Sequence, residues 1–128
     1  MKIFIVDDEI EMIDYYVDAL EMDDHVIVGT AANGEEAVKK YPELAERPDI
    51  VLMDHRMPIK NGMEATREIL QMDSDAKVII ASADHSVKNE AIRIGAIEFK
   101  QKPFSLDELL INIKKFEVQG SNQLIVDS

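Results

Sequence analysis

The stretch Ile50-Val51-Leu52-Met53-Asp54 decides the fold, because four consecutive apolar residues end at a carboxylate. A short continuous apolar run of this kind is typical of a strand buried on both faces of a parallel sheet. Similar runs, the last of them weaker, occupy residues 3–6, 26–28, 78–81 and 96–99. Segments between the runs show helical spacing, such as the apolar residues at 10, 13, 17 and 20. Strand and helix therefore alternate, which predicts an α/β fold with a doubly wound, five-stranded parallel sheet.

Helix starts can be located from capping patterns. Asn33, Asn61 and Ser105 each precede a glutamate by three residues, which is the pattern of a capping residue followed by a carboxylate in the first turn. After Phe116 the apolar periodicity is lost, and the segment that follows contains Gly120-Ser121-Asn122. We therefore predict one domain over residues 1–117 and a flexible C-terminal tail over residues 118–128.

The composition restricts the class of protein and its partners. A chain of 128 residues with 46% hydrophobic and 31% charged residues is typical of a single soluble globular domain. The net charge of -12 would repel nucleic acid and anionic lipid, so we expect no direct nucleic acid or membrane partner. The lack of cysteine excludes a zinc-thiolate site and a disulfide framework. The first apolar run is too short to span a membrane or form a signal peptide, and we expect a cytoplasmic location.

Polar residues gather at the predicted strand ends. They are Asp7 and Asp8 after the first strand, Asp54 at the third, Ser82 at the fourth and Lys102 after the fifth. In open α/β sheets, ligands bind beyond the carboxyl ends of the strands, so these residues should share one rim. Each alone has an ordinary explanation: Asp8 as a helix cap with Glu11, Asp54 as a turn residue, Ser82 as a small filler, Lys102 as a solvated charge. Their coincidence at four strand ends favours a site.

Three clustered carboxylates need a cation. Two unit charges about 4 Å apart repel by roughly 4 kcal/mol at an effective dielectric constant near 20. Lys102 offsets part of this repulsion, and a hard divalent ion suits an all-oxygen site. Magnesium prefers few protein ligands, several waters and a phosphate oxygen, whereas no histidine or cysteine has the spacing for zinc. The pattern therefore indicates Mg²⁺, or Mn²⁺ in its place, together with a phosphoryl group.

The chain resembles the receiver domains of two-component response regulators, the CheY-like family, from Lys2 to about Phe116. The resemblance is carried by Val6-Asp7-Asp8-Glu9, by Val51-Leu52-Met53-Asp54 with Met57-Pro58 and Gly62, by Ile80-Ala81-Ser82-Ala83, and by Gly95-Ala96 through Phe99 to Lys102-Pro103-Phe104. It implies a flavodoxin-like (βα)5 fold with strand order 2-1-3-4-5.

Site roles are implied by the same resemblance. Asp54 would accept a phosphoryl group from a histidine kinase, a phosphotransfer protein or a small donor such as acetyl phosphate. Asp8, Asp54 and the backbone carbonyl of Arg56 would ligate Mg²⁺, with Asp7 acting through water. Lys102 would pair with one phosphoryl oxygen, and Ser82 would donate a hydrogen bond to another. The protein would be a switch rather than an enzyme, although it would catalyse its own phosphorylation and dephosphorylation.

The output of the switch is implied less directly. Phe99 stands at the family's switch aromatic position, and a permanently buried core aromatic is the alternative. Movement of Ser82 and Phe99 would alter the surface of the fourth helix, fifth strand and fifth helix, and so signal to an effector protein. Arg56 and Asp84 lie where the family tunes phosphoryl lifetime, and their charges could pair across the site. The resemblance also implies a cis bond before Pro103. His55 is next to the acceptor, but the residue that follows the acceptor normally points away from the site, so we expect no role for His55 as a second phosphoryl carrier.

Two other functions remain as alternatives. A magnesium-dependent aspartyl phosphohydrolase usually has a second acid two residues after its nucleophile, where this chain has Arg56. A phosphorylation-independent interaction module would be expected to lose Asp54, Lys102 or the acidic pair. Within the favoured class, the sequence does not choose between a chemotaxis-type switch, a phosphorelay intermediate and a regulator of a separate output protein, nor exclude a piece of a longer regulator. Glu98, Lys100 and Lys115 match the family's dimer charges only loosely, and we expect a monomer.

Overall fold

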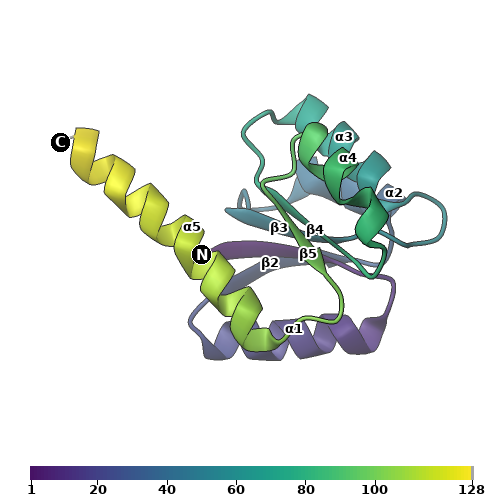
Figure 1. The fold of residues 1–128 in the computed structure, drawn as a ribbon, viewed down its shortest axis with the longest axis horizontal. Coiled ribbons are helices and arrows are strands. Elements are labelled where there is room, and N and C mark those ends of the chain that lie inside the picture. The colour runs from purple at the N-terminus through teal and green to yellow at the C-terminus, as the bar shows by residue number, and fades with distance from the viewer. Residues whose placement is uncertain (128) are drawn as a thin grey trace.

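The computed structural model describes the backbone of residues 1–127 and the side chains of residues 1–117. Five parallel strands form one sheet in the order β2-β1-β3-β4-β5, which confirms the predicted fold (Figure 1). The strands are β1 (Lys2–Val6), β2 (Val26–Ala31), β3 (Ile50–Asp54), β4 (Val78–Ser82) and β5 (Glu98–Gln101). The helices are α1 (Ile10–Met22), α2 (Gly34–Lys40), α3 (Gly62–Met72), α4 (Lys88–Arg93) and α5 (Leu106–Asp127), with short 3₁₀ turns η1 (Tyr41–Glu43) and η2 (His85–Val87).

Two apolar layers hold the helices against the sheet. Helices α1 and α5 cover one face, while α2, α3 and α4 cover the other (Figure 1). Successive residues of a strand point to opposite faces, so Ile3 and Ile5 join the first layer and Phe4 and Val6 the second. Every residue of β3 and β4 is buried, as expected for central strands covered on both sides. This packing fixes where the carboxyl ends of the strands lie.

The predicted helix starts are confirmed by hydrogen bonds. The side chains of Asn33 and Asn61 accept from the backbone N–H groups of Glu36 and Glu64 at 2.8 and 2.9 Å. Ser105 Oγ accepts from the N–H of Glu108 at 3.1 Å. Helix α5 then continues to Asp127. The side chains of the predicted tail, residues 118–128, lie outside the described part of the chain, and the boundary at residue 117 stays a prediction.

The fifth strand begins later than its apolar run. We expected it over residues 96–99, whereas β5 spans Glu98–Gln101. The reason lies in the end of α4, where Gly95 adopts a φ of +114° and the N–H of Ala96 donates to Ala91 O at 3.0 Å. Ala96 therefore closes the helix instead of starting the strand. Among the described residues, no helix combines the length and apolar character that crossing a bilayer requires.

Candidate functional site

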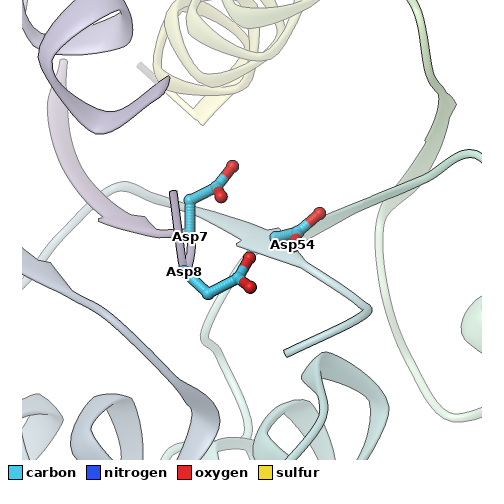
Figure 2. A group of neighbouring side chains, drawn as sticks. All are labelled: Asp7, Asp8 and Asp54. Carbon is cyan, nitrogen blue, oxygen red and sulfur yellow. The ribbon is translucent and has the colours of Figure 1, made fainter. Parts of the chain in front are cut away.

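Three aspartate side chains meet at the rim where β1 and β3 end (Figure 2). Asp7 and Asp8 follow β1, and Asp54 is the last residue of the neighbouring β3. One carboxylate oxygen from each lies within 4.8 Å of those from the other two. Asp7 and Asp54 are only 2% and 7% exposed, whereas Asp8 is open to solvent. The structure thus brings together the three carboxylates that the sequence analysis expected to converge.

The alternative in which Asp8 caps the first helix is wrong. The N-cap of α1 is Glu9, and it makes no side-chain capping hydrogen bond. Instead, the backbone N–H of Glu9 donates to Asp7 Oδ1 at 2.9 Å. Asp7 therefore holds the turn after β1 through one oxygen, which leaves the Asp8 carboxylate free of any role in starting the helix.

Lys102 supplies the positive charge of the rim. Its Nζ donates to Asp54 Oδ1 at 2.8 Å and lies 3.5 Å from Asp7 Oδ2. Its backbone N–H donates to Ser82 O at 2.9 Å, so the pairing of β4 with β5 sets the point from which the side chain reaches the acceptor. The Lys102-Pro103 peptide bond is cis, as the family resemblance implied.

The charges of the rim do not balance. Burial raises the pKa of Asp54 from 3.8 to about 6; Lys102 opposes this rise, and the charges of Asp7 and Asp8 add to it. Burial lowers the pKa of Lys102, but its hydrogen bond to Asp54 and the charges of Asp54 and Asp7 lift it above its ordinary value. Lys102 is therefore a cation at neutral pH. One ammonium facing three carboxylates leaves an excess of negative charge, which favours binding of a further cation.

Ser82 ends β4, the strand next to that of the acceptor, and Phe99 lies on β5, one strand further out. Ser82 is 2% exposed, and its Oγ accepts from the backbone N–H of Asp84 at 3.0 Å. Phe99 pairs in register with Ile80 and is buried, with its ring edge-on to that of His85 at a centroid distance of 6.2 Å. The Phe99 side chain thus points inward. This position fits both a switch aromatic and a permanently buried core aromatic, so it does not choose between the two.

An ion pair joins the loop that follows Asp54 to the loop that follows Ser82. Arg56 Nη2 lies 2.9 Å from Asp84 Oδ2, which confirms the charge pair that the sequence analysis suggested. The Arg56 side chain is 73% exposed, so the pair lies at the surface of the molecule. Burial and the charge of Arg56 lower the pKa of His55, so this ring is neutral at neutral pH. The pair links the segment after β3 to the segment after β4.

A groove beside the rim was missed by the sequence analysis, and we call it the side groove. Its volume is about 350 Å³, and it is lined by Glu9, Met12 and Tyr16, by Ala83, and by residues 102–104. The spacing of four residues between Met12 and Tyr16 is a sequence signal that they share a helix face. Nothing in the sequence indicated that this face borders the segment carrying Lys102.

Comparisons with known proteins agree with this geometry. Residues 3–114 match the model of the family described as response regulator receiver domain. Protein CcdB of Bacillus subtilis is 41% identical over 111 residues, covering 85% of this chain and 91% of that protein. Chemotaxis protein CheY of Thermotoga maritima is 40% identical over 116 residues, covering 89% and 95%.

A solved structure gives the same picture of the fold. It is the CheX-CheY-BeF3-Mg complex from Borrelia burgdorferi, with a TM-score of 0.84 and 30% identity over 90% of this chain and 87% of that one.

Proposed function

Since this chain belongs to the response regulator receiver domain family, we propose that it is the phosphoacceptor switch of a two-component system, with Asp54 as the acceptor. One observation carries the proposal: the Asp54 carboxylate is buried at a strand end, where it contacts Lys102 and lies close to two further carboxylates. We propose a histidine kinase or a phosphotransfer protein as the donor. The proposal places the protein in the cytoplasm, whose reducing conditions suit a chain without cysteine.

The residues of the rim account for phosphoryl transfer. A carboxylate oxygen of Asp54 attacks phosphorus, the bond between phosphorus and the donor atom breaks, and its electron pair leaves with the donor. Lys102, whose Nζ lies 2.8 Å from Asp54 Oδ1, would exchange this contact for one with a phosphoryl oxygen. Ser82 would turn its hydroxyl to donate to a second oxygen. Positioning and charge neutralisation supply most of the catalysis in such transfers.

The donor set fits a divalent ion. Asp8 and Asp54, with the backbone carbonyl of Arg56, would hold Mg²⁺ directly, and Asp7 would act through water because one of its oxygens already accepts from Glu9. The unbalanced negative charge around Asp54 supports this assignment, as does the Mg²⁺ in the Borrelia relative. When bound, the ion would neutralise charge on the phosphoryl oxygens.

The output is proposed to pass through Ser82 and Phe99 to the surface formed by α4, β5 and α5. If Ser82 Oγ moves toward the phosphoryl group, it gives up its contact with the N–H of Asp84. That N–H belongs to the segment leading into α4, so the change reaches the proposed surface. An effector protein would read it; the Borrelia relative in complex with CheX supports a protein partner of this kind.

We further propose that the protein works as a monomer. Lys100, one of the charges expected in a dimer interface, lies 3.9 Å from Glu108 of the same chain and over the ring of Phe104. The Lys100 ammonium group therefore interacts within its own chain, which leaves it less available for a contact between two chains.

The direct test is intact-mass spectrometry after incubation with phosphoramidate or acetyl phosphate, with Mg²⁺ or with EDTA. We expect a single phosphoryl adduct that forms at least about tenfold faster with Mg²⁺ and is lost over time. Absence of an adduct under every condition would overturn the proposal and favour a phosphorylation-independent interaction module. Release of phosphate from unrelated phosphate esters would favour the phosphohydrolase alternative.

The Arg56–Asp84 pair gives a second prediction, which concerns the lifetime of the adduct. Exposed ion pairs contribute about 0.2–1 kcal/mol, so Arg56→Ala should shorten the lifetime by no more than about fivefold, through easier access of water to phosphorus. The measurement is the decay of the adduct after removal of the donor. Asp84→Ala is less suitable, because Asp84 also caps η2 through Ser86. An unchanged lifetime would show that the pair has no part in water access.

A further inference from the structure

The segment that carries Lys102 is short, and a single side chain attaches its middle to the domain. Residues 102–105 join β5 to α5. At the start of the segment, the backbone N–H of Lys102 donates to Ser82 O at 2.9 Å. Pro103 and Ser105 are exposed, whereas Phe104 is partly buried. The position of the Phe104 ring therefore affects where the neighbouring Lys102 side chain begins.

Tyr16 of α1 holds the ring of Phe104 in place. The two rings stack, with 6.3 Å between centroids and 11° between planes. Tyr16 is only 4% exposed and belongs to the apolar layer in which Phe104 also packs. Lys100 Nζ lies 5.6 Å from the centroid of the Phe104 ring, so the ring is also held from β5. The stack ties the segment after β5 to the helix that follows Asp7 and Asp8.

The phenol group of Tyr16 also lies near the ammonium group of Lys102. Both residues line the side groove. Burial raises the pKa of the phenol to about 12; the charge of Lys102 opposes this rise, and the charges of Asp7 and Asp54 add to it. Such effects require that the charged groups lie close to the phenol. The hydroxyl is neutral at neutral pH, and its oxygen can accept a hydrogen bond from an ammonium group.

The ammonium group of Lys102 has a donor to spare for this hydroxyl. An ammonium group carries three N–H donors. Lys102 directs one to Asp54 Oδ1 at 2.8 Å, and its Nζ lies 3.5 Å from Asp7 Oδ2. In the proposed transfer, the contact with Asp54 is exchanged for one with a phosphoryl oxygen. A neutral acceptor beside the ammonium group restrains it during this exchange and adds no negative charge to a rim that already has an excess.

We propose that Tyr16 is a positioning residue for phosphoryl transfer: its ring, stacked on Phe104, fixes the segment that carries Lys102, and its hydroxyl accepts a hydrogen bond from the Lys102 ammonium group. The proposal rests on the proposed function and adds one residue to it. In this role Tyr16 does not touch phosphorus and acts on the rate only through Lys102. Small displacements of a group that contacts the reacting atoms have large effects on rate, so loss of the stack should slow the transfer.

The first test separates the ring of Tyr16 from its hydroxyl. The rate of adduct formation is measured by intact-mass spectrometry with phosphoramidate and Mg²⁺. Tyr16→Leu removes the stack and the hydroxyl, and should slow uptake in the folded protein by about tenfold or more. Tyr16→Phe keeps the stack and loses one hydrogen bond, so it should slow uptake by about threefold. Normal uptake in Tyr16→Leu would overturn the proposal, and normal uptake in Tyr16→Phe would overturn the role of the hydroxyl.

The second test asks whether the effect of Tyr16 passes through Lys102. The same two changes are made in Lys102→Ala, and the slower uptake of that variant is followed over long incubations at high phosphoramidate. If Tyr16 acts only by positioning Lys102, neither Tyr16→Leu nor Tyr16→Phe has a partner left to displace, and each should change the rate by less than about twofold. Equal slowing by Tyr16→Leu with and without Lys102 would show a general effect of packing and overturn the proposal.

Tyr41→Leu is the matched control for lost stability. Tyr41 is another buried tyrosine, and it packs against Phe4 on the opposite face of the sheet from Tyr16. This variant should unfold at a lower urea concentration and keep the normal rate of uptake in the folded protein. Slowing as large as that of Tyr16→Leu would assign the effect to stability and overturn the proposal. If the unmodified chain takes phosphoryl from no donor, the proposed function itself fails, which is a different outcome.

Discussion

Asp54→Asn is expected to abolish phosphoryl uptake. The amide cannot act as the attacking oxygen nucleophile, so the rate of adduct formation should fall by at least about a hundredfold with every donor. The measurement is intact-mass spectrometry with phosphoramidate and Mg²⁺, on the variant and the unmodified chain in parallel. Uptake at the normal rate would show that another residue is the acceptor and would remove the basis of the proposed site.

The control is the stability of the same variant, because loss of uptake must not come from unfolding. The pKa of Asp54 is about 6 in the folded chain, above its ordinary value of 3.8. A raised carboxyl pKa stabilises the fold below the ordinary value, and this contribution is lost as the pH rises through about 6. At pH 7.5 the ionised carboxylate therefore destabilises the metal-free protein, by an amount on the order of 3 kcal/mol for a shift of two pH units.

Removing this charge should therefore stabilise the fold. In EDTA at pH 7.5, Asp54→Asn should unfold at a higher urea concentration than the unmodified chain, by about 1–3 kcal/mol in the free energy of unfolding. Near pH 4, where the carboxyl group is protonated, the difference should approach zero. A variant that is less stable at pH 7.5 would contradict the raised pKa and the excess of negative charge on which the Mg²⁺ assignment depends.

The location of the site could be predicted from sequence because it follows from the topology of the sheet. Parallel strands place their carboxyl ends on one edge, so the positions of Asp7, Asp54 and Ser82 after apolar runs were enough to bring them together. The register of β4 with β5 then puts Lys102 beside Ser82, which the order of the strands already implied. Long apolar runs identify buried strands reliably, and the site residues could be located because they stand directly at the ends of these runs.

Features that depend on packing between helices and loops were not predicted. The cap of α1 falls on Glu9 rather than Asp8, because Asp7 already fixes the turn through the N–H of Glu9. The side groove is lined by Tyr16 and Phe104, whose rings stack although the two residues are far apart in the chain. Neither the cap at Glu9 nor the contact between the two rings produces a periodic pattern in the sequence, so neither could be predicted from it.

Gly62 is the second site of large expected effect, and the reason is close approach of two backbones. Gly62 is the first residue of α3, and its N–H donates to His55 O at 2.8 Å. A Cβ atom at this position would lie 2.2 Å from the carbonyl oxygen of Asp54 and 2.9 Å from its carbonyl carbon. These are backbone atoms that cannot rotate away, so Gly62→Ala must push α3 from the end of β3 and displace the acceptor.

Gly62→Ala should therefore reduce both stability and phosphoryl uptake. We expect a loss of about 2–4 kcal/mol in the free energy of unfolding, as for other overpacked sites. Uptake from phosphoramidate in the folded protein should slow by about a hundredfold, because a shift near 1 Å at a reacting group has effects of this size. Urea unfolding and the rate of adduct formation are the two measurements.

Gly95→Ala is the matched control for that variant. Gly95 has a φ of +114°, which strains any side chain. It precedes the amino end of β5, however, whereas Asp54 lies at the carboxyl end of β3. This variant should lose about 1–2 kcal/mol of stability and keep the normal rate of uptake in the folded protein. If both glycine variants slowed uptake equally, loss of stability alone would explain the effect; if only Gly62→Ala does, the close contact between α3 and Asp54 is what holds the acceptor in place.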